Sequence, residues 1–458
     1  MNLPAVFLDQ LRAALPPGAL LTGPGERLVY ATDNSKREGL PDAVALPETA
    51  AQVQAVVAIC FEHRVPLTAR GRGSNTTGAS IAAQGGVVLS CERMQRILTI
   101  NSADRYAVVE PGVLNGELQA ALAPHGFFWA PDPTSAPYST VGGNLACNAG
   151  GPRTVKYGAA RDNLLALRAV DGRGRAFTCG AAVTKNSTGF DLTRLIAGSE
   201  GTLALITEAT LRLTPLPEAR RGMRALYASI DTAAAAVARL MAQPVVPAAL
   251  EFMDARAVEL VRARGVALPE ATRALLLIDA DGRRDALDDA VRALQAAANG
   301  PGLIEWAVAQ DAAELDALWA ARKALSPALR SVAPDKINED VVVPVSQVPA
   351  LIERVQALSA RYTIPIVCFG HAGNGNLHVN LLFDRSDARQ AQAAEDCLGE
   401  VFAAVLALGG TLSGEHGIGL AKREFMRQAL DPVTLELMRA IKAEFDPAGI
   451  LNPGKLLP

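Results

Sequence analysis

The segment Arg70-Gly-Arg-Gly-Ser-Asn-Thr-Thr-Gly78 directly follows an apolar run at residues 65–69 that has the composition of a β-strand. Glycines let a chain turn tightly enough to aim successive backbone N–H groups at one point, which creates an anion site. The hydroxyl and amide side chains of the segment add donors, and its two arginines add positive charge suited to phosphate. The segment therefore predicts a loop that binds a phosphate-bearing ligand.

A second glycine-rich segment covers residues 131–151 and ends in Val141-Gly-Gly-Asn-Leu-Ala-Cys-Asn-Ala-Gly-Gly151. It shows neither helix nor strand character, and compact domains seldom keep so long a loop without a function. The usual nucleotide-binding motifs are missing. Thr76 stands where the Rossmann fingerprint needs glycine, and Leu456 stands where the P-loop-like run at residues 449–455 needs a following Ser or Thr. No G-x-S-x-G motif occurs either. The two loops together indicate a large phosphate-bearing cofactor held by another fold.

The two halves of the chain differ in composition. The first alternates short β-rich runs with glycine-rich loops, and the second is rich in Ala and Arg at helical spacing. Pro215 and Pro217 separate them, so we expect a domain boundary there. In the first half we expect a helix at residues 48–63 and strands at 65–69, 86–90, 96–100 and 106–110. In the second half we expect helices at 232–242, 283–299, 312–325 and 432–445 and a strand at 274–279.

Composition excludes several classes of protein. The 458 residues suffice for two or three domains, and 50% hydrophobic with 20% charged residues describes a globular chain. A net charge of −3 gives no footprint for nucleic acid. Six cysteines without a C-x-x-C pair argue against zinc fingers, iron–sulfur clusters and a disulfide framework. With no signal-peptide pattern and no apolar run of membrane-spanning length, we expect a cytoplasmic protein, with attachment to the membrane surface left open.

Three of the five histidines stand in two glycine-rich motifs, Gly370-His-Ala-Gly-Asn-Gly-Asn-Leu-His-Val-Asn380 and Ser413-Gly-Glu-His-Gly-Ile-Gly419. Apolar runs flank the first motif on both sides, so we expect a hairpin that brings His371 and His378 together. Alternation places Asn380 on the same face as His378. With Glu415, the two imidazoles form a ligand set suited to a divalent metal, for which Zn²⁺ is the first expectation and Mn²⁺ and Fe²⁺ are the alternatives.

The order of the two loops, then Gly198-Ser-Glu-Gly-Thr202 with Ile206-Thr-Glu208, resembles the FAD-binding domain of the vanillyl-alcohol-oxidase/PCMH flavoprotein superfamily. In that family the first loop wraps the pyrophosphate, the second passes the flavin ring and ribityl chain, and the third reaches the adenosine side. The resemblance implies FAD, held non-covalently because neither loop contains a histidine. The residues that it implies near FAD are Arg70, Gly71, Gly73, Ser74, Asn75, Gly142, Gly143, Asn148, Glu200 and the backbone of Ile206.

The second half resembles the C-terminal domain of FAD-linked oxidases acting on D-2-hydroxy acids, a group that includes D-lactate, glycolate and D-2-hydroxyglutarate dehydrogenases. The two histidine motifs carry this likeness, with Asn374 where relatives usually have Asp, and the Pro/Gly tail implies that Asn452 lies near the flavin ring. The resemblance implies an α+β fold in three parts. These are a PCMH-type FAD-binding domain of two subdomains at residues 1–216, an α+β substrate domain with an antiparallel sheet at 217–428, and a C-terminal segment at 429–458 that packs back on the FAD domain.

The same resemblance implies an activity, the oxidation of a D-2-hydroxy acid to its 2-oxo acid with hydride passing to FAD. The metal bound by the two imidazoles and Glu415 would polarise the hydroxyl, and His416 would be the general base. Asn380 would hold the substrate hydroxyl or carboxylate, and Arg322 would contact a carboxylate. The electron acceptor is left open among a quinone, a cytochrome and an electron-transferring flavoprotein, and so are a partner subunit and a homodimer.

The size of the substrate depends on three positions. In relatives that oxidise D-2-hydroxyglutarate, the arginine of a W-x-x-R segment, a hydroxyl residue four positions later and a lysine hold the second carboxylate. Arg322 and Ser326 match, but Asn338 stands where lysine is expected, and Lys336 lies two residues earlier, about 6.6 Å along a strand. A second carboxylate without a well-placed cation binds poorly. We therefore expect a short monocarboxylate such as D-lactate or D-2-hydroxybutyrate, with D-2-hydroxyglutarate or glycolate as alternatives.

Two further classes stay open from the residues alone. One is a metal-dependent hydrolase or lyase whose glycine-rich loops bind a nucleotide substrate. The other is a binding protein that keeps the fold without turnover. A flavin spectrum that D-lactate bleaches in the absence of oxygen separates the dehydrogenase from both.

Overall fold

The computed structural model describes residues 3–458, apart from the side chain of Ala321. The chain forms two compact units, and the boundary between Leu216 and Pro217 falls between the two prolines that separate the halves of the sequence. The C-terminal part of the first unit begins at Glu415, whereas the sequence placed it at residue 429, and a short excursion into the second unit was not foreseen. The first unit comprises Met1–Gly151, Gly158–Leu216 and Glu415–Pro458, and the second comprises Pro152–Tyr157 and Pro217–Gly414.

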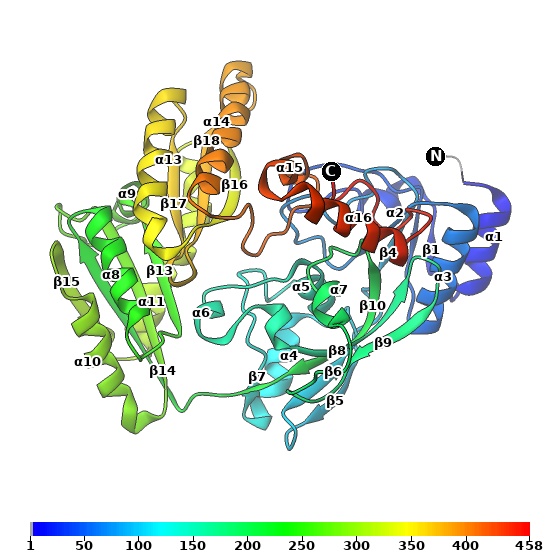
Figure 1. Ribbon diagram of the computed structural model, residues 1–458, viewed down its shortest axis with the longest axis horizontal. Helices are drawn as coiled ribbons and strands as arrows, with labels where there is room; N and C mark the ends of the chain where they lie inside the picture. The colour runs from blue at the N-terminus through cyan, green and yellow to red at the C-terminus, as the bar shows by residue number, and fades with distance from the viewer. Residues whose placement is uncertain (1–2) are drawn as a thin grey trace. The chain divides into compact units, whose positions relative to one another are not determined.

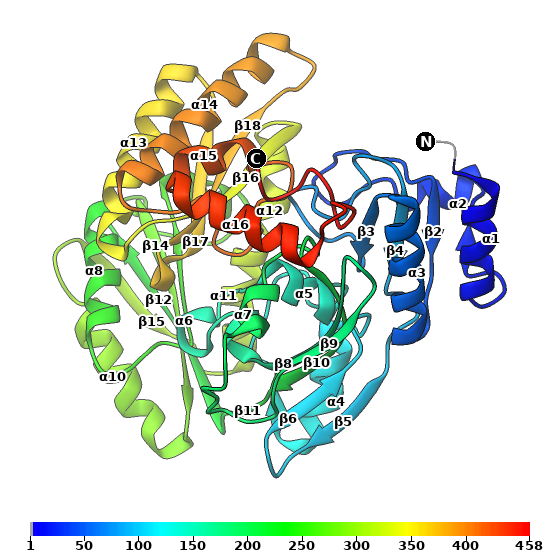
Figure 2. The same cartoon turned by 45° about the vertical axis from the view of Figure 1, so that its right-hand side comes forward.

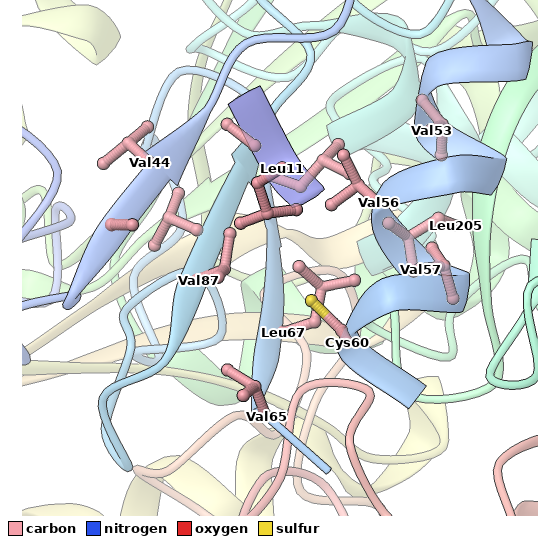
Figure 3. Packing of buried hydrophobic residues seen from close by; sticks show 14 of the residues in the cluster. Leu11, Val44, Val53, Val56, Val57, Cys60, Val65, Leu67, Val87 and Leu205 are labelled. Carbon is pink, nitrogen blue, oxygen red and sulfur yellow. The ribbon is translucent and has the colours of Figure 1, made fainter. Parts of the chain in front are cut away.

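A small sheet with the strand order β1-β2-β4-β3 forms one part of the first unit, and β2, β4 and β3 run parallel. Helix α3 lies against it (Figure 2), and it begins where Thr49 accepts a hydrogen bond from the Gln52 backbone N–H at 3.3 Å. Figure 3 shows the apolar stripe of α3 packed on these strands, as its spacing predicts. The elements are α1 (Ala5–Ala14), β1 (Leu20–Leu21), α2 (Pro24–Leu28), β2 (Ala43–Ala45), α3 (Ala50–His63), β3 (Leu67–Arg70) and β4 (Val87–Ser90).

A second sheet of the first unit is antiparallel, with the order β5-β6-β10-β8-β9. The C-terminal tail returns to the first sheet, because Leu451 bridges Leu67 of β3 in parallel and α16 belongs to the same unit. The elements are β5 (Ile97–Asn101), β6 (Tyr106–Val109), α4 (Asn115–Leu122), β7 (Phe127–Phe128), α5 (Val141–Cys147), β8 (Leu164–Asp171), β9 (Ala176–Gly180), α7 (Leu192–Ile196), β10 (Ala204–Arg212), β11 (Thr214–Pro215), α15 (Met426–Ala429) and α16 (Pro432–Phe445).

The expectation that residues 131–151 lack regular structure was wrong. Helix α5 occupies the middle of this segment, although it contains the consecutive glycines 142 and 143. Thr140 caps it by accepting a hydrogen bond from the Gly143 backbone N–H at 3.1 Å. Val141 and Leu145 are fully buried in the core between this helix and the five-stranded sheet. Capping and tertiary packing thus outweigh a helix propensity that glycine lowers by about 1 kcal/mol per residue.

The second unit is built on a seven-stranded antiparallel sheet, ordered β15-β12-β14-β13-β17-β18-β16. The expected strand and helices of this half are present within a few residues of their expected bounds. The strands are β12 (Ala219–Tyr227), β13 (Ala249–Met253), β14 (Ala274–Gly282), β15 (Leu303–Val308), β16 (Asp335–Val342), β17 (Ile366–His371) and β18 (Asn376–Phe383). The helices are α6 (Thr154–Tyr157), α8 (Ile230–Ala242), α9 (Ala255–Ala263), α10 (Leu287–Ala298), α11 (Ala312–Lys323), α12 (Leu325–Ala328), α13 (Val348–Tyr362) and α14 (Ala388–Ala407).

Helices cover both faces of this sheet. On one face, α13 and α14 lie side by side over β17 and β18, next to α8 and α10 (Figure 1). On the other face, α9, α11 and α12 enclose a core that includes Met253, Phe369 and Leu382. The polar residues considered below share this second face, because residues paired across antiparallel strands point to the same side of a sheet. No helix within residues 3–458 combines the length and apolar content that a membrane span requires.

Candidate functional site

The first glycine-rich loop of the first unit has a row of unused donors. Within the described chain, none of the backbone N–H groups from Gly71 to Thr76 donates a hydrogen bond to a protein acceptor. The Thr76 hydroxyl is buried and also lacks a protein partner. Gly73 has a φ of +66°, and a side chain there would collide with the Arg70 guanidinium. A run of N–H groups without protein acceptors, next to an unpartnered hydroxyl, fits the phosphate-bearing cofactor that the sequence predicts.

Arg70, at the start of this loop, is fixed by hydrogen bonds. Its guanidinium donates to the Thr32 carbonyl at 2.7 Å and to the Ser80 carbonyl at 3.3 Å, and it lies over the Tyr30 ring. Burial lowers the pKa of Arg70, and the nearby charge of Asp33 opposes that shift. The sequence assigned its charge to phosphate, whereas the structure uses two of its donors on backbone carbonyls.

Asn75 connects the loop to the second histidine motif. Its side-chain oxygen accepts hydrogen bonds from the backbone N–H groups of Thr77 and Ala79 at 2.8 and 3.0 Å. Its amide group donates to the backbone carbonyl of His416 at 3.1 Å and to the sulfur of Cys147 at 3.4 Å. The segment that carries His416 is therefore fixed to the first loop within one unit.

Glu200 fixes the same segment from another direction. Its carboxylate accepts hydrogen bonds from the backbone N–H groups of Ile418 at 2.6 Å and Gly419 at 2.8 Å. Gly417 has a φ of +84°, and a side chain there would meet the Glu200 carboxylate at 2.5 Å. Burial raises the pKa of Glu200, while the two N–H groups and the charge of Lys455 lower it. Glu200 is thus an anchor for the residues after His416, a role that its resemblance-based assignment to FAD did not foresee.

The remaining residues assigned to FAD all lie in the first unit. Asn452 is buried and joins the third loop to the tail, because its amide donates to the carbonyls of Glu200 at 2.7 Å and Ala79 at 2.8 Å. Asn148 ends α5 in the left-handed conformation and accepts a hydrogen bond from the Arg161 backbone N–H at 2.9 Å. The other positions are Gly71 and Ser74 in the first loop, Gly142 and Gly143 in α5, and Ile206 in β10.

The expected histidine hairpin is present in the second unit. β17 and β18 pair antiparallel, with Phe369 opposite His378 and His371 opposite Asn376, across a turn at residues 372–375. The two imidazole rings meet edge to face with centroids 5.2 Å apart. Both side chains are buried, and their ligand nitrogens lie within 4.8 Å of each other. This separation allows both imidazoles to ligate one metal ion.

Glu251 of β13 is a site residue that the sequence interpretation missed. Its carboxylate contacts the Nδ1 atom of His371 at 2.5 Å and accepts a hydrogen bond from the Nε–H of Arg322 at 2.8 Å. Burial by itself would raise the pKa of Glu251, but the charges of His371 and Arg322 outweigh it and lower the pKa to about 2. The signal in the sequence was a single acidic residue inside the apolar strand 249–253, since an unpaired carboxylate is almost never fully buried.

Arg322 projects from α11 onto the same face of the sheet. Its side chain is only 13% exposed, and its guanidinium lies over the Phe369 ring at 4.6 Å. It is therefore no solvent-exposed helical arginine. With Nε bound to Glu251, its terminal nitrogens are the groups left for a carboxylate ligand.

Three polar residues extend this face across β18 and β16, and Ser326 of α12 adds a fourth. Asn380 pairs with Asn338, and the side-chain oxygens of both are buried without a partner among the residues that the structure describes. Lys336 donates from Nζ to the Ser326 hydroxyl at 2.8 Å. The structure thus brings Lys336 and Ser326 together, although the lysine stands two residues from its expected place.

Glu415, the third expected metal ligand, directly follows the second unit in the chain. Gly414 is the last residue of that unit, and its backbone N–H donates to the Asp340 carboxylate at 2.9 Å. Asp340 lies opposite His378 in the sheet. The chain therefore leaves the second unit beside the strand that carries His378, and the next residue is Glu415.

Comparison with known families defines the class of protein. The family of FAD-linked oxidases, C-terminal domain, matches residues 216–456, and the FAD-binding domain family matches residues 41–180. The chain therefore belongs to the FAD-linked oxidases, and it is an FAD-dependent oxidoreductase. The fold agrees with this class. The structure of p-cresol methylhydroxylase with substrate bound matches this chain at a TM-score of 0.82 and 18% identity, over 98% of this chain and 96% of the other. The expected α+β architecture with a PCMH-type FAD-binding domain is therefore confirmed.

Relatives with assigned names cover almost the whole chain. It is 37% identical to the glycolate oxidase subunit GlcD of Bacillus subtilis, over 94% of this chain and 92% of the relative. It is 33% identical to the D-2-hydroxyglutarate dehydrogenase of Stutzerimonas stutzeri, over 98% of each chain. It is also 33% identical to the D-lactate dehydrogenase of Anaerostipes hadrus, over 91% of this chain and 89% of the relative.

Proposed function

We propose that this protein oxidises a short D-2-hydroxy monocarboxylate, D-lactate first, to the 2-oxo acid. The observation that carries the proposal is the buried pair His371 and His378, with Arg322 beside it, on a chain of the FAD-linked oxidase family. The names of the relatives support a 2-hydroxy acid as the substrate class. FAD, bound without a covalent link, supplies the acceptor for the hydride.

A divalent metal is part of the proposal, with His371, His378 and Glu415 as its ligands. The two buried imidazoles are close enough to share one ion, and Glu251 leaves Nε2 of His371 as its ligand atom. The metal, when bound, supplies a Lewis acid that polarises the 2-hydroxyl. Zn²⁺ suits two imidazoles and one carboxylate, and Mn²⁺ and Fe²⁺ are the alternatives.

Three protein side chains bind the substrate or accept its proton. His416 removes the hydroxyl proton, since a neutral imidazole can accept a proton and Asn75 holds the backbone of this residue in place. Arg322 binds the substrate carboxylate through its terminal nitrogens, because Glu251 occupies Nε. Asn380 offers the substrate hydroxyl an acceptor, its buried side-chain oxygen, which has no partner in the described chain.

Among the described residues, we assign no dedicated cation to the second carboxylate of D-2-hydroxyglutarate. Asn338 occupies the strand position next to Asn380, and the ammonium of Lys336 is bound to Ser326. D-2-hydroxyglutarate remains the second candidate, because Lys336 and Ser326 form a polar pair on the face of the sheet that carries Asn380. Glycolate is the third, because it is a short monocarboxylate and the name of the Bacillus subtilis relative includes it.

The experiment mixes FAD-reconstituted protein without oxygen with D-lactate, glycolate, D-2-hydroxyglutarate and, as a matched control, L-lactate. We expect D-lactate to bleach the flavin band with the highest second-order rate constant and L-lactate to leave it unchanged. A flavin that no 2-hydroxy acid reduces would contradict the proposal, because the substrate of this oxidoreductase would then belong to another chemical class. Faster reduction by D-2-hydroxyglutarate would transfer the assignment to the dicarboxylate.

A further inference from the structure

Glu251 lies at the centre of the seven-stranded sheet with no exposed surface. On β13 it stands opposite His371 of β17, 120 residues away in the sequence. Each oxygen of its carboxylate has its own partner, one at His371 Nδ1 and the other at Arg322 Nε. A single buried carboxylate therefore contacts both the expected metal ligand and the expected substrate-binding arginine.

The contact with His371 selects a tautomer. A carboxylate accepts hydrogen bonds, so Nδ1 carries the proton and the lone pair of a neutral ring lies on Nε2. A carboxylate behind a ligating imidazole also fixes the ring plane and strengthens the ring as a ligand. In its neutral form, His371 therefore presents Nε2 as the ligand atom, with the ring plane already fixed by Glu251.

The contact with Arg322 selects an orientation. The guanidinium is held at Nε by Glu251 and below by the Phe369 ring, so its plane is fixed on two sides. The bond to Glu251 uses the Nε–H donor, so the terminal nitrogens keep N–H donors for a ligand. A planar guanidinium held in this way is prepared for a two-pronged contact with a carboxylate.

We propose that Glu251 is a positioning residue that couples the metal site to the site for the substrate carboxylate. The inference rests on the proposed function. One side chain sets both the ligand form of His371 and the direction of Arg322, so its loss weakens metal binding and substrate binding together. The loss of an ion pair with a purely structural role would change neither metal binding nor substrate binding.

The same sheet supplies a matched control. Asp279 of β14 is a second buried carboxylate on this face, and it is bound by Arg220 and by the Trp319 indole N–H at 3.1 Å. Trp319, which binds Asp279, and Arg322, which binds Glu251, are three residues apart on α11, so one helix covers both carboxylates. Asp279 has no imidazole partner in the described chain. Asp279→Asn therefore removes a comparable buried charge without touching the proposed coupling.

The experiment measures Co²⁺ binding to metal-free, FAD-loaded protein by its visible absorption, and the KM for D-lactate of the metal-saturated enzyme. We expect Glu251→Gln to weaken Co²⁺ binding by about 10- to 100-fold, the range for a carboxylate behind a ligating histidine. We also expect a higher KM for D-lactate in this variant and no change of either value in Asp279→Asn. Co²⁺ binding that is equal in wild type and Glu251→Gln, or equally weakened in Asp279→Asn, would overturn the inference.

The wild-type result and one further measurement keep the outcomes separate. A wild-type protein that binds no Co²⁺ would refute the metal in the proposed function itself, whatever the variants do. In metal-free wild type, ¹⁵N spectra of the His371 ring, assigned by comparison with His371→Ala, should show the proton on Nδ1 at a pH where the ring is neutral. A proton on Nε2 would overturn the inference even if Glu251→Gln failed to fold.

Discussion

Replacing Glu200 with Gln distinguishes two roles for this residue in the first unit. The structure makes Glu200 the acceptor for the backbone N–H groups of Ile418 and Gly419, whereas family resemblance places it near FAD. A glutamine keeps one acceptor oxygen, but its NH₂ group faces the second N–H. The variant thus loses one charge-assisted hydrogen bond and leaves a buried donor unpaired, at a cost of about 2–4 kcal/mol. Burial lowers the pKa of Lys455 to about 8, and the variant removes the Glu200 charge that opposes this shift.

The expected consequence is a looser segment around His416 with FAD still bound. For a domain of this size, the loss lowers the melting temperature by roughly 5–15 °C. The rate of flavin reduction by D-lactate should fall by about 10- to 100-fold, since small displacements of a catalytic group have effects of this size. Scanning calorimetry and stopped-flow absorbance measure the two quantities, and the dissociation constant of FAD should stay within about threefold of wild type.

Glu208→Gln is the matched control, because Glu208 lies on β10 of the same unit in a loose ion pair with Arg168 at 3.7 Å. Such a pair contributes less than about 1 kcal/mol, so this variant should resemble wild type in every assay. If Glu200→Gln instead released FAD while its stability and its FAD-saturated rate stayed normal, Glu200 would contact the cofactor and the anchoring role would be refuted.

Three other predictions concern the catalytic residues and the substrate. His416→Ala should lower turnover by about 10²–10⁴-fold with FAD and metal retained, and near-normal turnover over the whole pH range would assign the base to another group. His371→Ala and Glu415→Ala should lose the metal as well as activity. Metal analysis of the purified variants measures this, and full metal content in either variant would remove that residue from the ligand set. Asn338→Lys should raise kcat/KM for D-2-hydroxyglutarate by about tenfold or more, the effect of one charge-assisted hydrogen bond. The value of kcat/KM for D-lactate should change less. No gain with D-2-hydroxyglutarate would show that Asn338 does not face the distal carboxylate.

Local patterns were sufficient for much of the fold. The cap residue Thr49 and the apolar spacing after it place α3 to within two residues, and the histidine hairpin follows from two apolar runs around a glycine-rich turn. Helix 432–445 has the bounds that its amphipathic pattern predicts. In these elements propensity, pattern and packing agree, which is the condition under which a sequence can be read locally.

The contacts that build the site could not be predicted in this way. Glu251 meets His371 only because β13 and β17 are neighbours in the sheet, and strand order over 120 residues is not a local property. Asn75 and Glu200 were recognised as part of loops near a cofactor, but their partners at residues 416–419 come from the far end of the chain. Helix α5 was missed because Thr140 and the surrounding core override its glycines.

The rate of flavin reduction by D-lactate, with and without metal, tests the central claim most directly. The protein is freed of metal by chelation, mixed with D-lactate in the absence of oxygen, and then measured again after Zn²⁺ is restored. We predict a loss of at least about 100-fold without metal, since a Lewis acid contributes several kcal/mol, and recovery with Zn²⁺. Bound flavin and melting temperature should stay nearly constant, because the second unit has its own core. Equal rates in both states would contradict the role of the metal, and a flavin that D-lactate and the other 2-hydroxy acids leave oxidised in both states would contradict the proposed reaction.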